Sequence, residues 1–351
     1  MICQEAIIIS DRSLILAIET SCDDTSAAVL EDGRNILANT IYSQIATHRP
    51  FGGVVPEIAS RQHLEQIIPV IDGALAEAAI SLQDLTAIGV TYGPGLVGAL
   101  LVGVAQAKAL AYALKIPLIG VHHLVGHIYA NLIEHPNLKL PALCLVVSGG
   151  HTSLVLWRSH QEIKMLGATL DDAAGEAFDK IARELGLGYP GGPAIEKMAG
   201  FGDPNAFAFP RAWLGKGSLD FSFSGLKSAV LNYLNNTKQR GDQIPIADVS
   251  AGFQEAIVEV LVEKTILAAQ MHDLNTIVLA GGVAANQRLR ESLRQKTAAT
   301  GRQVLWPSPV YCTDNAAMIA MAAYYRQLEG DFADLSLNAI PYLPLEAFFK
   351  K

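Results

Sequence analysis

Short apolar runs alternate with small polar loops along the chain, and the most regular pattern occurs twice. Residues 14–29 (LILAIETSCDDTSAAV) and 142–157 (ALCLVVSGGHTSLVLW) each place a loop rich in hydroxyl groups or glycine between two apolar stretches. Each pattern predicts a β-hairpin. Helical sequence follows the second hairpin over 172–185, with Asp171 or Asp172 placed to cap it. The repeat indicates an α/β protein made of two similar halves, each a mixed sheet with helices.

Residues 86–107 contain no charged side chain and are long enough to cross a membrane. Gly93, Pro94 and Gly95 interrupt this stretch and would break a helix in its middle. Because buried parallel strands read as continuous apolar runs, the stretch predicts a buried strand over 87–91, a turn and then a buried helix. We expect no membrane span.

The composition is that of a globular protein with a large core. Of 351 residues, 50% are hydrophobic and 17% are charged, which excludes a disordered chain. The formal net charge is −8, so a nucleic acid would have to bind a local basic patch on an acidic body. The four cysteines form no CxxC pair, and the first residues lack a basic, apolar leader. These features favour a cytoplasmic protein.

The Gly-Gly turns at 149–150, 191–192 and 281–282 are the first indication of nucleotide binding. The last pair follows an apolar run and precedes a helix that we expect to start near Asn286. Backbone N–H groups at such a loop and helix N-terminus can approach a phosphate closely. None of the three matches GxGxxG, so a dinucleotide site is not indicated.

His123 and His127 are four residues apart, which places both imidazoles on one face of a helix, where they could hold one metal ion. They could equally be core or surface histidines. Asp314 is the best third ligand, although it could instead be the N-cap of the helix that follows it. Leu124 stands where an HExxH peptidase needs its catalytic glutamate, so a peptidase would lack its general base.

Adjacent carboxylates at Asp23 and Asp24, in the first hairpin turn, could bind magnesium or accept a proton, or could simply be solvated turn residues. Lys227, in a segment that lacks P-loop spacing, could approach a phosphate. Basic side chains that could contact RNA or form solvated faces are Arg49, Arg61, Arg288, Arg290, Arg294, Lys296 and Arg302.

Ten segments in this order resemble the TsaD family of tRNA N6-adenosine threonylcarbamoyltransferases, formerly called O-sialoglycoprotein endopeptidases. They are 18–25 (IETSCDDT), 52–63 (GGVVPEIASRQH), 91–96 (TYGPGL), 122–127 (HHLVGH), 147–152 (VSGGHT), 171–179 (DDAAGEAFD), 189–193 (YPGGP), 221–227 (FSFSGLK), 280–286 (AGGVAAN) and 312–315 (CTDN). The resemblance covers nearly the whole chain.

The resemblance implies the duplicated two-lobe α/β fold of actin, Hsp70 and the sugar kinases, with a nucleotide cleft between the lobes. We expect an extension at 1–13, an N-terminal lobe at 14–135 and a C-terminal lobe at 140–345, whose end could pack back on the first lobe. The implied acyltransferase moves the threonylcarbamoyl group of threonylcarbamoyl-AMP to the N6 amine of the adenosine 3′ of the anticodon, in tRNAs that read codons starting with A. AMP is released.

The family's site residues map onto positions of this chain. Its divalent metal, with iron favoured over zinc, maps onto His123, His127 and Asp314, and Asp23 or Asp24 is the implied catalytic acid or base. The implied substrate and nucleotide contacts are Val146, Val147, Ser148, Gly149, Gly150, Asp179, Gly192, Glu196 and Asn286. Two positions depart from the family pattern: Asp24 replaces a frequent Glu, and Val125 stands where many relatives have Glu.

The implied partners are tRNA, the smaller paralogue TsaB, the ATPase TsaE and TsaC, which makes the adenylate. Magnesium with ATP or ADP could also bind. Three alternatives remain at this point: a kinase or ATPase of the same fold, which needs no histidine metal site, a metallopeptidase, and a scaffold without catalytic activity.

Overall fold

The computed structural model describes residues 12–349, and this part of the chain divides into two compact units. The first unit holds the described residues up to Ser43, Pro56–Tyr129 and Asn315–Leu343. The second holds Gln44–Val55, Ala130–Asp314 and the described residues from Pro344 onward. The chain therefore passes between the units five times: after Ser43, after Val55, within helix α4 (His123–Glu134), after Asp314 and after Leu343.

The first unit is built on a five-stranded sheet in the order β3-β2-β1-β4-β5. Strands β1, β2 and β3 pair antiparallel, and β4 and β5 continue the sheet in parallel. Its strands are β1 (Leu14–Glu19), β2 (Asp24–Glu31), β3 (Asn35–Ser43), β4 (Ala87–Gly93) and β5 (Leu118–His122). Its helices are α2 (Pro56–Glu77), the short 3-10 helix η2 (Leu82–Asp84), α3 (Val97–Leu114) and α11 (Ala316–Leu328).

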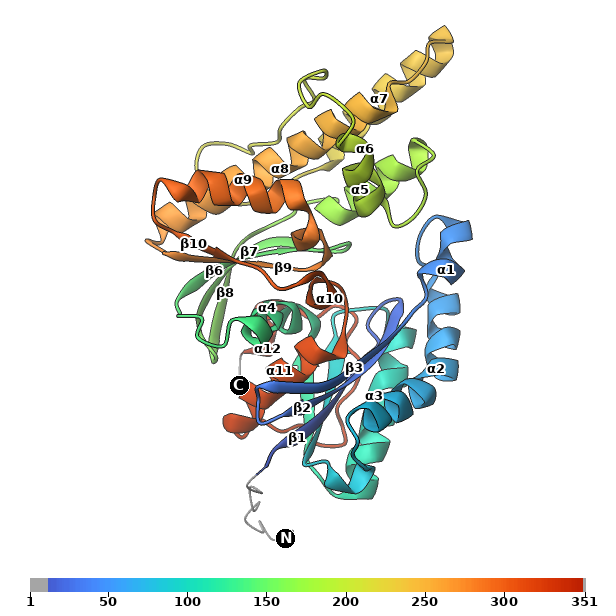
Figure 1. The fold of residues 1–351 in the computed structure, drawn as a ribbon, viewed down its shortest axis with the longest axis vertical. Coiled ribbons are helices and arrows are strands. Elements are labelled where there is room, and N and C mark those ends of the chain that lie inside the picture. Colours follow the sequence, from blue (N-terminus) through green and yellow to red (C-terminus); the bar gives the residue numbers. More distant parts are fainter. Residues whose placement is uncertain (1–11, 350–351) are drawn as a thin grey trace. The chain divides into compact units, whose positions relative to one another are not determined.

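Helices cover both faces of this sheet, which explains its uninterrupted apolar strands. Alternate side chains of β1, such as Leu16 and Ile18, join a core with α2 and α3. On the other face α11 packs so closely that a Cβ on Gly89 would lie 2.9 Å from the Cβ of Ala323. Figure 1 shows α11, from the end of the chain, lying beside the N-terminal strands.

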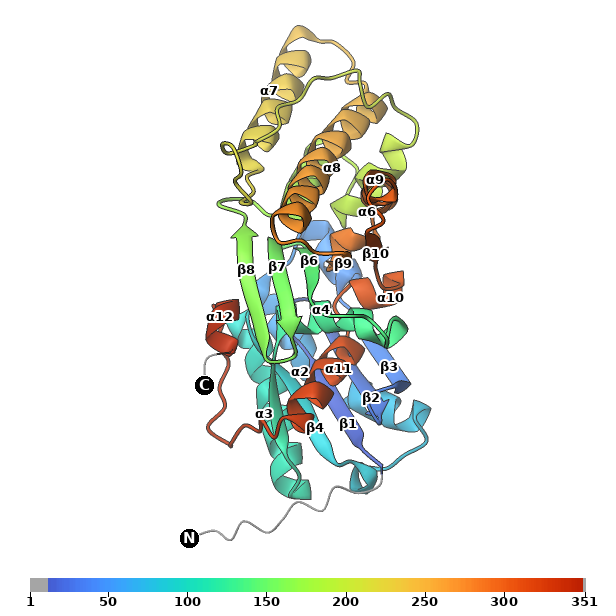
Figure 2. The same cartoon turned by 90° about the vertical axis from the view of Figure 1, so that its left-hand side faces the viewer.

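The second unit repeats this topology in a sheet of order β10-β9-β6-β7-β8. Again three consecutive strands pair antiparallel and two more continue in parallel. The strands are β6 (Ala142–Val147), β7 (Thr152–Ser159), β8 (Glu162–Ala168), β9 (Thr276–Ala280) and β10 (Gln303–Leu305). Figure 2 shows β8, β7, β6 and β9 side by side. This identical strand order confirms the predicted duplication and the α/β fold class.

The second unit also carries most of the helices. They are α1 (Ile45–His48), the 3-10 helix η1 (Arg49–Phe51), α5 (Ala174–Glu184), α6 (Gly191–Ala199), α7 (Ser224–Arg240), α8 (Ile246–Met271), the 3-10 helix η3 (Gly282–Ala285), α9 (Gln287–Ala298), α10 (Pro309–Cys312) and α12 (Leu345–Phe348). Helices α5, α8 and α9 contribute Phe178, Phe253 and Leu289, all almost fully buried, to one core that includes apolar side chains of β6 and β7.

The two units differ from the simple boundaries expected at 14–135 and 140–345. Residues 44–55 group with the second unit, and 315–343 group with the first. The reason is packing: α11 lies on the first sheet, whereas Arg49 of η1 and the following Gly52 contact Tyr189 and Arg183. Of the expected extension at 1–13, residues 1–11 lie outside the described part of the chain.

The uncharged stretch at 86–107 forms β4, a turn and the first part of α3, as predicted, but the helix is partly exposed where a buried one was expected. Within residues 12–349, α3 is the one helix long and apolar enough to cross a membrane, and a third of it is buried. Core helices of soluble proteins meet the same criterion, and α3 packs on β4 through Ala99, Leu100 and Val104.

Candidate functional site

Helix α4 begins directly after the buried strand β5, and this junction sets the positions of the predicted metal ligands. His123 is the first residue of α4, and His127 lies one turn later. Their side chains are 6% and 1% exposed, and their rings meet edge to face with centroids 4.6 Å apart. The i, i+4 spacing therefore places both imidazoles together, as predicted.

The third predicted ligand reaches the same place. Donor atoms of His123, His127 and Asp314 all lie within 4.8 Å of one another. The alternative role of Asp314 as a helix cap is wrong, because the side chain of Asn315 caps α11 by accepting from the Met318 N–H at 3.0 Å. Two nitrogens and one carboxylate oxygen suit iron(II) or zinc and leave coordination positions open. The residues present therefore fit a divalent transition metal.

A buried glutamate that the sequence reasoning missed orients the first histidine. Glu19, at the end of β1, is fully buried, and its Oε2 lies 3.1 Å from His123 Nδ1. The same carboxylate accepts from the Thr91 hydroxyl at 2.6 Å and the Ser21 N–H at 2.5 Å. A carboxylate that accepts from Nδ1 leaves the Nε2 lone pair for a metal. The signal in the sequence was an acid that ends a wholly apolar strand.

Asp23 lies in the turn before β2, Asp24 is the first residue of β2, and neighbouring side chains tie both to this region. The Ser21 hydroxyl lies 3.1 Å from His123 Nδ1. His63, buried on α2, contacts the Cys22 carbonyl at 2.9 Å through Nε2 and the Thr25 hydroxyl at 2.7 Å through Nδ1. Sequence reasoning also missed His63, which lies in a segment singled out only for its resemblance. The imidazole holds both sides of the acidic turn.

The other predicted residues lie in the second unit, around the β6–β7 turn. Gly149 and Gly150 are exposed, and a Cβ built on either would meet no atom within 4 Å. By contrast, a Cβ on Gly175, at the start of α5, would lie 2.5 Å from the Ser148 carbonyl oxygen. The helix thus packs directly under the turn while the glycine main chain stays open to an approaching ligand.

Close contacts of the same kind bring α6 beside α5. The Gly191 N–H donates to Asp179 Oδ1 at 2.6 Å, and a Cβ on Gly191 would lie 2.5 Å from the Asp179 Cα. The next residue, Gly192, again faces open space. From α6, Glu196 accepts from the Gln287 N–H at 2.6 Å and so joins α6 to the start of α9.

Three of the predicted substrate residues have structural roles of their own. Val146 and Val147 are fully buried at the end of β6. Asn286 caps α9, because its Oδ1 accepts from the Leu289 N–H at 2.9 Å, while its Nδ2 donates to Gln254. Their side chains therefore support the region that the two open glycine turns surround.

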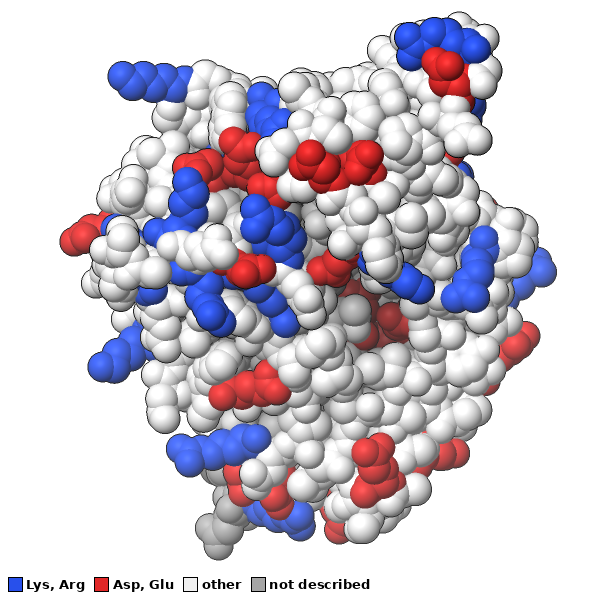
Figure 3. Space-filling view, turned by 45° about the horizontal axis from the view of Figure 1, so that its top comes forward, with Lys and Arg blue, Asp and Glu red and all other residues white. Residues whose placement is uncertain are grey.

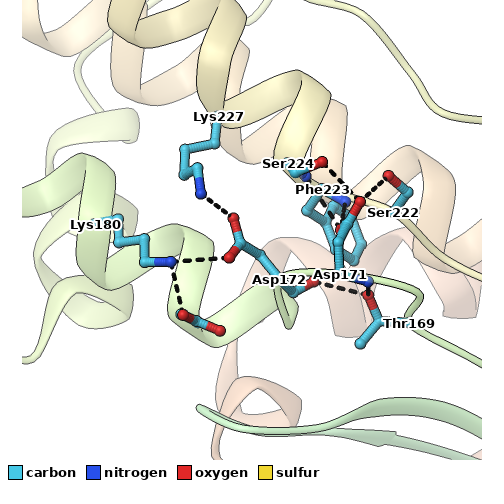
Figure 4. A network of polar contacts seen from close by, with 9 residues as sticks. Thr169, Asp171, Asp172, Lys180, Ser222, Phe223, Ser224 and Lys227 are labelled. Carbon is cyan, nitrogen blue, oxygen red and sulfur yellow. Dashed lines mark hydrogen bonds and ion pairs between the residues drawn. The ribbon is translucent and has the colours of Figure 1, made fainter.

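The predicted cap of α5 is wrong, because both aspartates bind elsewhere (Figure 4). Asp171 accepts from the Ser222 and Ser224 hydroxyls and from two backbone N–H groups at the start of α7. Burial raises the pKa of the Asp171 carboxyl, but these hydrogen bonds outweigh it and leave the pKa below its usual value. Asp171 is thus the anchor of α7.

The neighbouring Asp172 binds two lysines (Figure 4). Its carboxylate pairs with Lys180 at 2.8 Å and with Lys227. Burial raises its pKa, yet the bonds from the two ammonium groups outweigh that effect and lower it overall. Lys227, which could have approached a phosphate, therefore joins α7 to the loop before α5 and helps to position the open turn.

Two duplicated sheets of identical order define the class, a protein of the actin, Hsp70 and sugar-kinase fold, and two histidines and an aspartate form its candidate metal site. Solved structures of this fold include HypF from T. kodakarensis, with a TM-score of 0.62 at 13% identity over 91% of this chain and 48% of that one. Another is component A of the Acidaminococcus fermentans (R)-2-hydroxyglutaryl-CoA dehydratase, with a TM-score of 0.52 at 15% identity over 90% of this chain and 99% of that one.

Closer relatives identify the family. Residues 35–321 match the family described as TsaD, tRNA N6-adenosine threonylcarbamoyltransferase. The protein of that name from Moorella thermoacetica is 62% identical over 94% of this chain and 97% of its own length. The one from Desulfitobacterium hafniense is 59% identical over the same shares. The chain belongs to the TsaD family.

Proposed function

We propose that this chain transfers the threonylcarbamoyl group of threonylcarbamoyl-AMP to the N6 amine of the adenosine 3′ of the anticodon, in tRNAs that read codons starting with A. AMP leaves. The observation that carries the proposal is the convergence of His123, His127 and Asp314 in a member of the TsaD family. A tRNA substrate makes the cytoplasm the expected location.

The proposed metal is iron, with zinc as the alternative, held by His123 Nε2, His127 and Asp314. When bound, an ion with open positions supplies Lewis acidity to phosphate or acyl oxygens. Glu19 keeps the imidazole of His123 in one tautomer and orientation, which supports this assignment. Leu124 follows His123, so the glutamate that an HExxH metallopeptidase uses as its general base is replaced at that position.

The second unit would hold the adenylate. Gly149, Gly150 and Gly192 leave the main chain open, so backbone groups could approach a phosphate or ribose closely. Asp179 fixes the turn before α6, and Glu196 fixes α6 on α9, which keeps the glycine turns at a constant separation. We propose that this arrangement aligns the acyl carbon with the incoming amine.

The adenine amine is a poor nucleophile, because its lone pair is delocalised into the ring. We propose that Asp23 or Asp24 accepts its proton or orients the metal ligands. His63 supports this role by fixing the turn on both sides. Replacing each aspartate by asparagine should lower turnover about 100-fold in at least one variant with adenylate binding retained. Full activity in both variants would end the assignment.

Protein partners form the remaining part of the proposal: the paralogue TsaB, the ATPase TsaE, and TsaC as the source of adenylate, with magnesium and ATP or ADP as further ligands. Exposed apolar side chains on two helices that pack together support a protein partner. Leu64 and Ile68 of α2 are 65% and 48% exposed, and Leu101 and Tyr112 of α3 are 45% and 72% exposed. Such a patch is typical of a protein interface.

The decisive experiment combines the purified chain with its partner proteins, threonine, bicarbonate, ATP and unmodified tRNA. Mass spectrometry of the digested tRNA should detect threonylcarbamoyl-adenosine. A kinase or ATPase of the same fold would consume ATP on a small molecule and keep its activity in His123→Ala. A peptidase would cleave protein without tRNA, and a scaffold would support no turnover in any combination.

A further inference from the structure

The short segment Gln44–Val55, between β3 and α2, is held against the rest of the second unit by two arginines. The Arg183 guanidinium, from the last turn of α5, donates to the Gly52 carbonyl. It lies so close that a Cβ on Gly52 would be 2.8 Å from Arg183 Nε. Arg49 Nε reaches the Tyr189 carbonyl oxygen at 3.4 Å. Glycine at 52, where φ is +68°, is therefore needed both for the turn and for the approach of Arg183.

The interior of this segment is also fixed. His48 is fully buried, with Nε2 3.1 Å from the Gln44 side-chain oxygen and Nδ1 accepting from the Val55 N–H at 3.3 Å. The segment is thus a defined surface element, presented by the second unit, whose outward side chains have settled positions.

The side chains on the surface of this segment and of the neighbouring α5 and α5–α6 loop are cationic and aromatic. Arg49 and Arg183 are exposed, Phe51 is 57% exposed, and Tyr189 is half-buried. We call these four residues the Arg49–Arg183 surface. Within residues 12–349 neither guanidinium has an acidic partner, since both donate to backbone carbonyls. Their positive charge is therefore available to an anion.

The larger group of basic residues on and after α9, which includes Arg288 and Lys296, differs because acidic side chains pair with it. Arg288 binds Glu255 at 2.7 Å, and Lys296 binds Glu263 at 2.6 Å, so acidic side chains of α8 neutralise much of it. Figure 3 shows blue and red side chains intermingled on the left of the molecule, where α8 and α9 lie in Figure 1. A polyanion gains less from cations that are already paired.

The Arg49–Arg183 surface also adjoins the expected adenylate site. Tyr189 lies two residues before Gly191, whose N–H binds Asp179. Guanidinium groups without an acidic partner, beside an exposed phenylalanine and a half-buried tyrosine, are the chemistry that binds single-stranded RNA, with phosphates on the cations and bases stacked on the rings. On an acidic chain, such a local surface must supply the attraction.

We propose that the Arg49–Arg183 surface binds the single-stranded anticodon loop of the tRNA, and that Phe51 stacks on one of its bases. This inference rests on the proposed function, for which it supplies the docking surface. It predicts that an isolated anticodon stem-loop competes with whole tRNA, whereas the same stem closed by an abasic loop competes poorly.

The test compares Arg49→Ala and Phe51→Ala with Arg294→Ala, an exposed arginine of α9 that serves as the matched control. Affinity for unmodified tRNA is measured by fluorescence anisotropy at several salt concentrations, with the partner proteins present. We expect Arg49→Ala to weaken binding about tenfold and to reduce the salt slope by about 0.7. Phe51→Ala should weaken binding about tenfold with the slope unchanged. Arg294→Ala should remain within about twofold of the parent.

If Arg49→Ala and Phe51→Ala both bind tRNA with the affinity and salt slope of the parent chain, the proposed docking surface is wrong. It is also wrong if these variants no longer bind one of the partner proteins but still bind tRNA with unchanged affinity. These outcomes are distinct from failure of the proposed function. If the parent chain modifies tRNA and the variants bind it normally, only the docking surface is wrong. If the parent chain makes no modified nucleoside, the proposed function is wrong.

Discussion

The two hairpin turns occupy the same topological position in the duplicated sheets but differ in their surroundings: side chains bind the first, and the main chain of the second is open. The β1–β2 turn is bound by side chains: His63 holds Cys22 and Thr25, and Ser21 contacts His123. The β6–β7 turn carries Gly149 and Gly150, which leave open space beside the main chain. One scaffold therefore supplies a rigid polar turn beside the candidate metal site and an open turn suited to a phosphate.

The largest effect should come from removing a metal ligand beside the first turn. His123→Ala should lose the ion and lower the rate of transfer at least about 1,000-fold, because Lewis acidity contributes several kcal/mol to the barrier. Mass spectrometry of the protein measures its metal content, and the amount of modified nucleoside formed per tRNA over time measures the rate. His135→Ala, just beyond α4, should retain the metal. If His123→Ala kept its metal and its activity, the assignment of a catalytic metal site beside the β1–β2 turn would be wrong.

A substitution at Glu19 tests whether this buried carboxylate orients His123 as a metal ligand. Glu19→Gln should weaken metal affinity about 10- to 100-fold, because the amide no longer fixes the hydrogen on His123 Nδ1. Titration of the metal-free protein with cobalt(II), followed by its absorption spectrum, gives the affinity without turnover. Thr91→Val removes one hydrogen bond to the same carboxylate and should have a smaller effect. Equal affinities in Glu19→Gln and the parent would contradict this role.

Substitution of the open turn should separate ligand binding from folding. Gly149→Val should raise the KM for the adenylate about tenfold and leave the melting temperature unchanged, because its side chain enters space that only a ligand would fill. Gly175→Ala should instead destabilise the fold, since its Cβ would lie 2.5 Å from the Ser148 carbonyl oxygen. The opposite pattern, with Gly149→Val unstable and KM unaltered, would mean that the turn is merely structural.

The smallest effect concerns the stability of the network behind the open turn. Asp172→Asn should cost about 1 to 2 kcal/mol of unfolding free energy at neutral pH. Because the folded pKa of Asp172 is lowered, this contribution is complete above the unfolded pKa of about 4 and is lost as pH falls through the folded value. Urea unfolding across this pH range measures it. Asp242→Asn, in an exposed pair with Arg240, should change stability by less than about 0.5 kcal/mol. A cost that did not vary with pH would argue against the ion pairs.

Much of the architecture followed from local pattern. Apolar runs predicted the strands on both sides of each hairpin turn, and the i, i+4 histidines predicted one face of α4. These succeed because strand and helix periods act over a few residues. The cap of α5 failed for the complementary reason. Asp171 and Asp172 have the right spacing for a cap, but α7, some 50 residues further on, offers them hydroxyls, N–H groups and ammonium groups instead.

By itself the sequence determined the strands, the glycine turns and the residue types that can hold a metal or approach a phosphate, because these depend on neighbours along the chain. Only the tertiary structure decided that Asp314 joins the two histidines while Asn315 caps the helix, that Glu19 faces His123, and that Arg183 lies on Gly52. Except for the cap by Asn315, each of these contacts joins residues far apart in sequence. Their meeting depends on how buried surfaces pack and on where buried polar groups find partners, which no local pattern records.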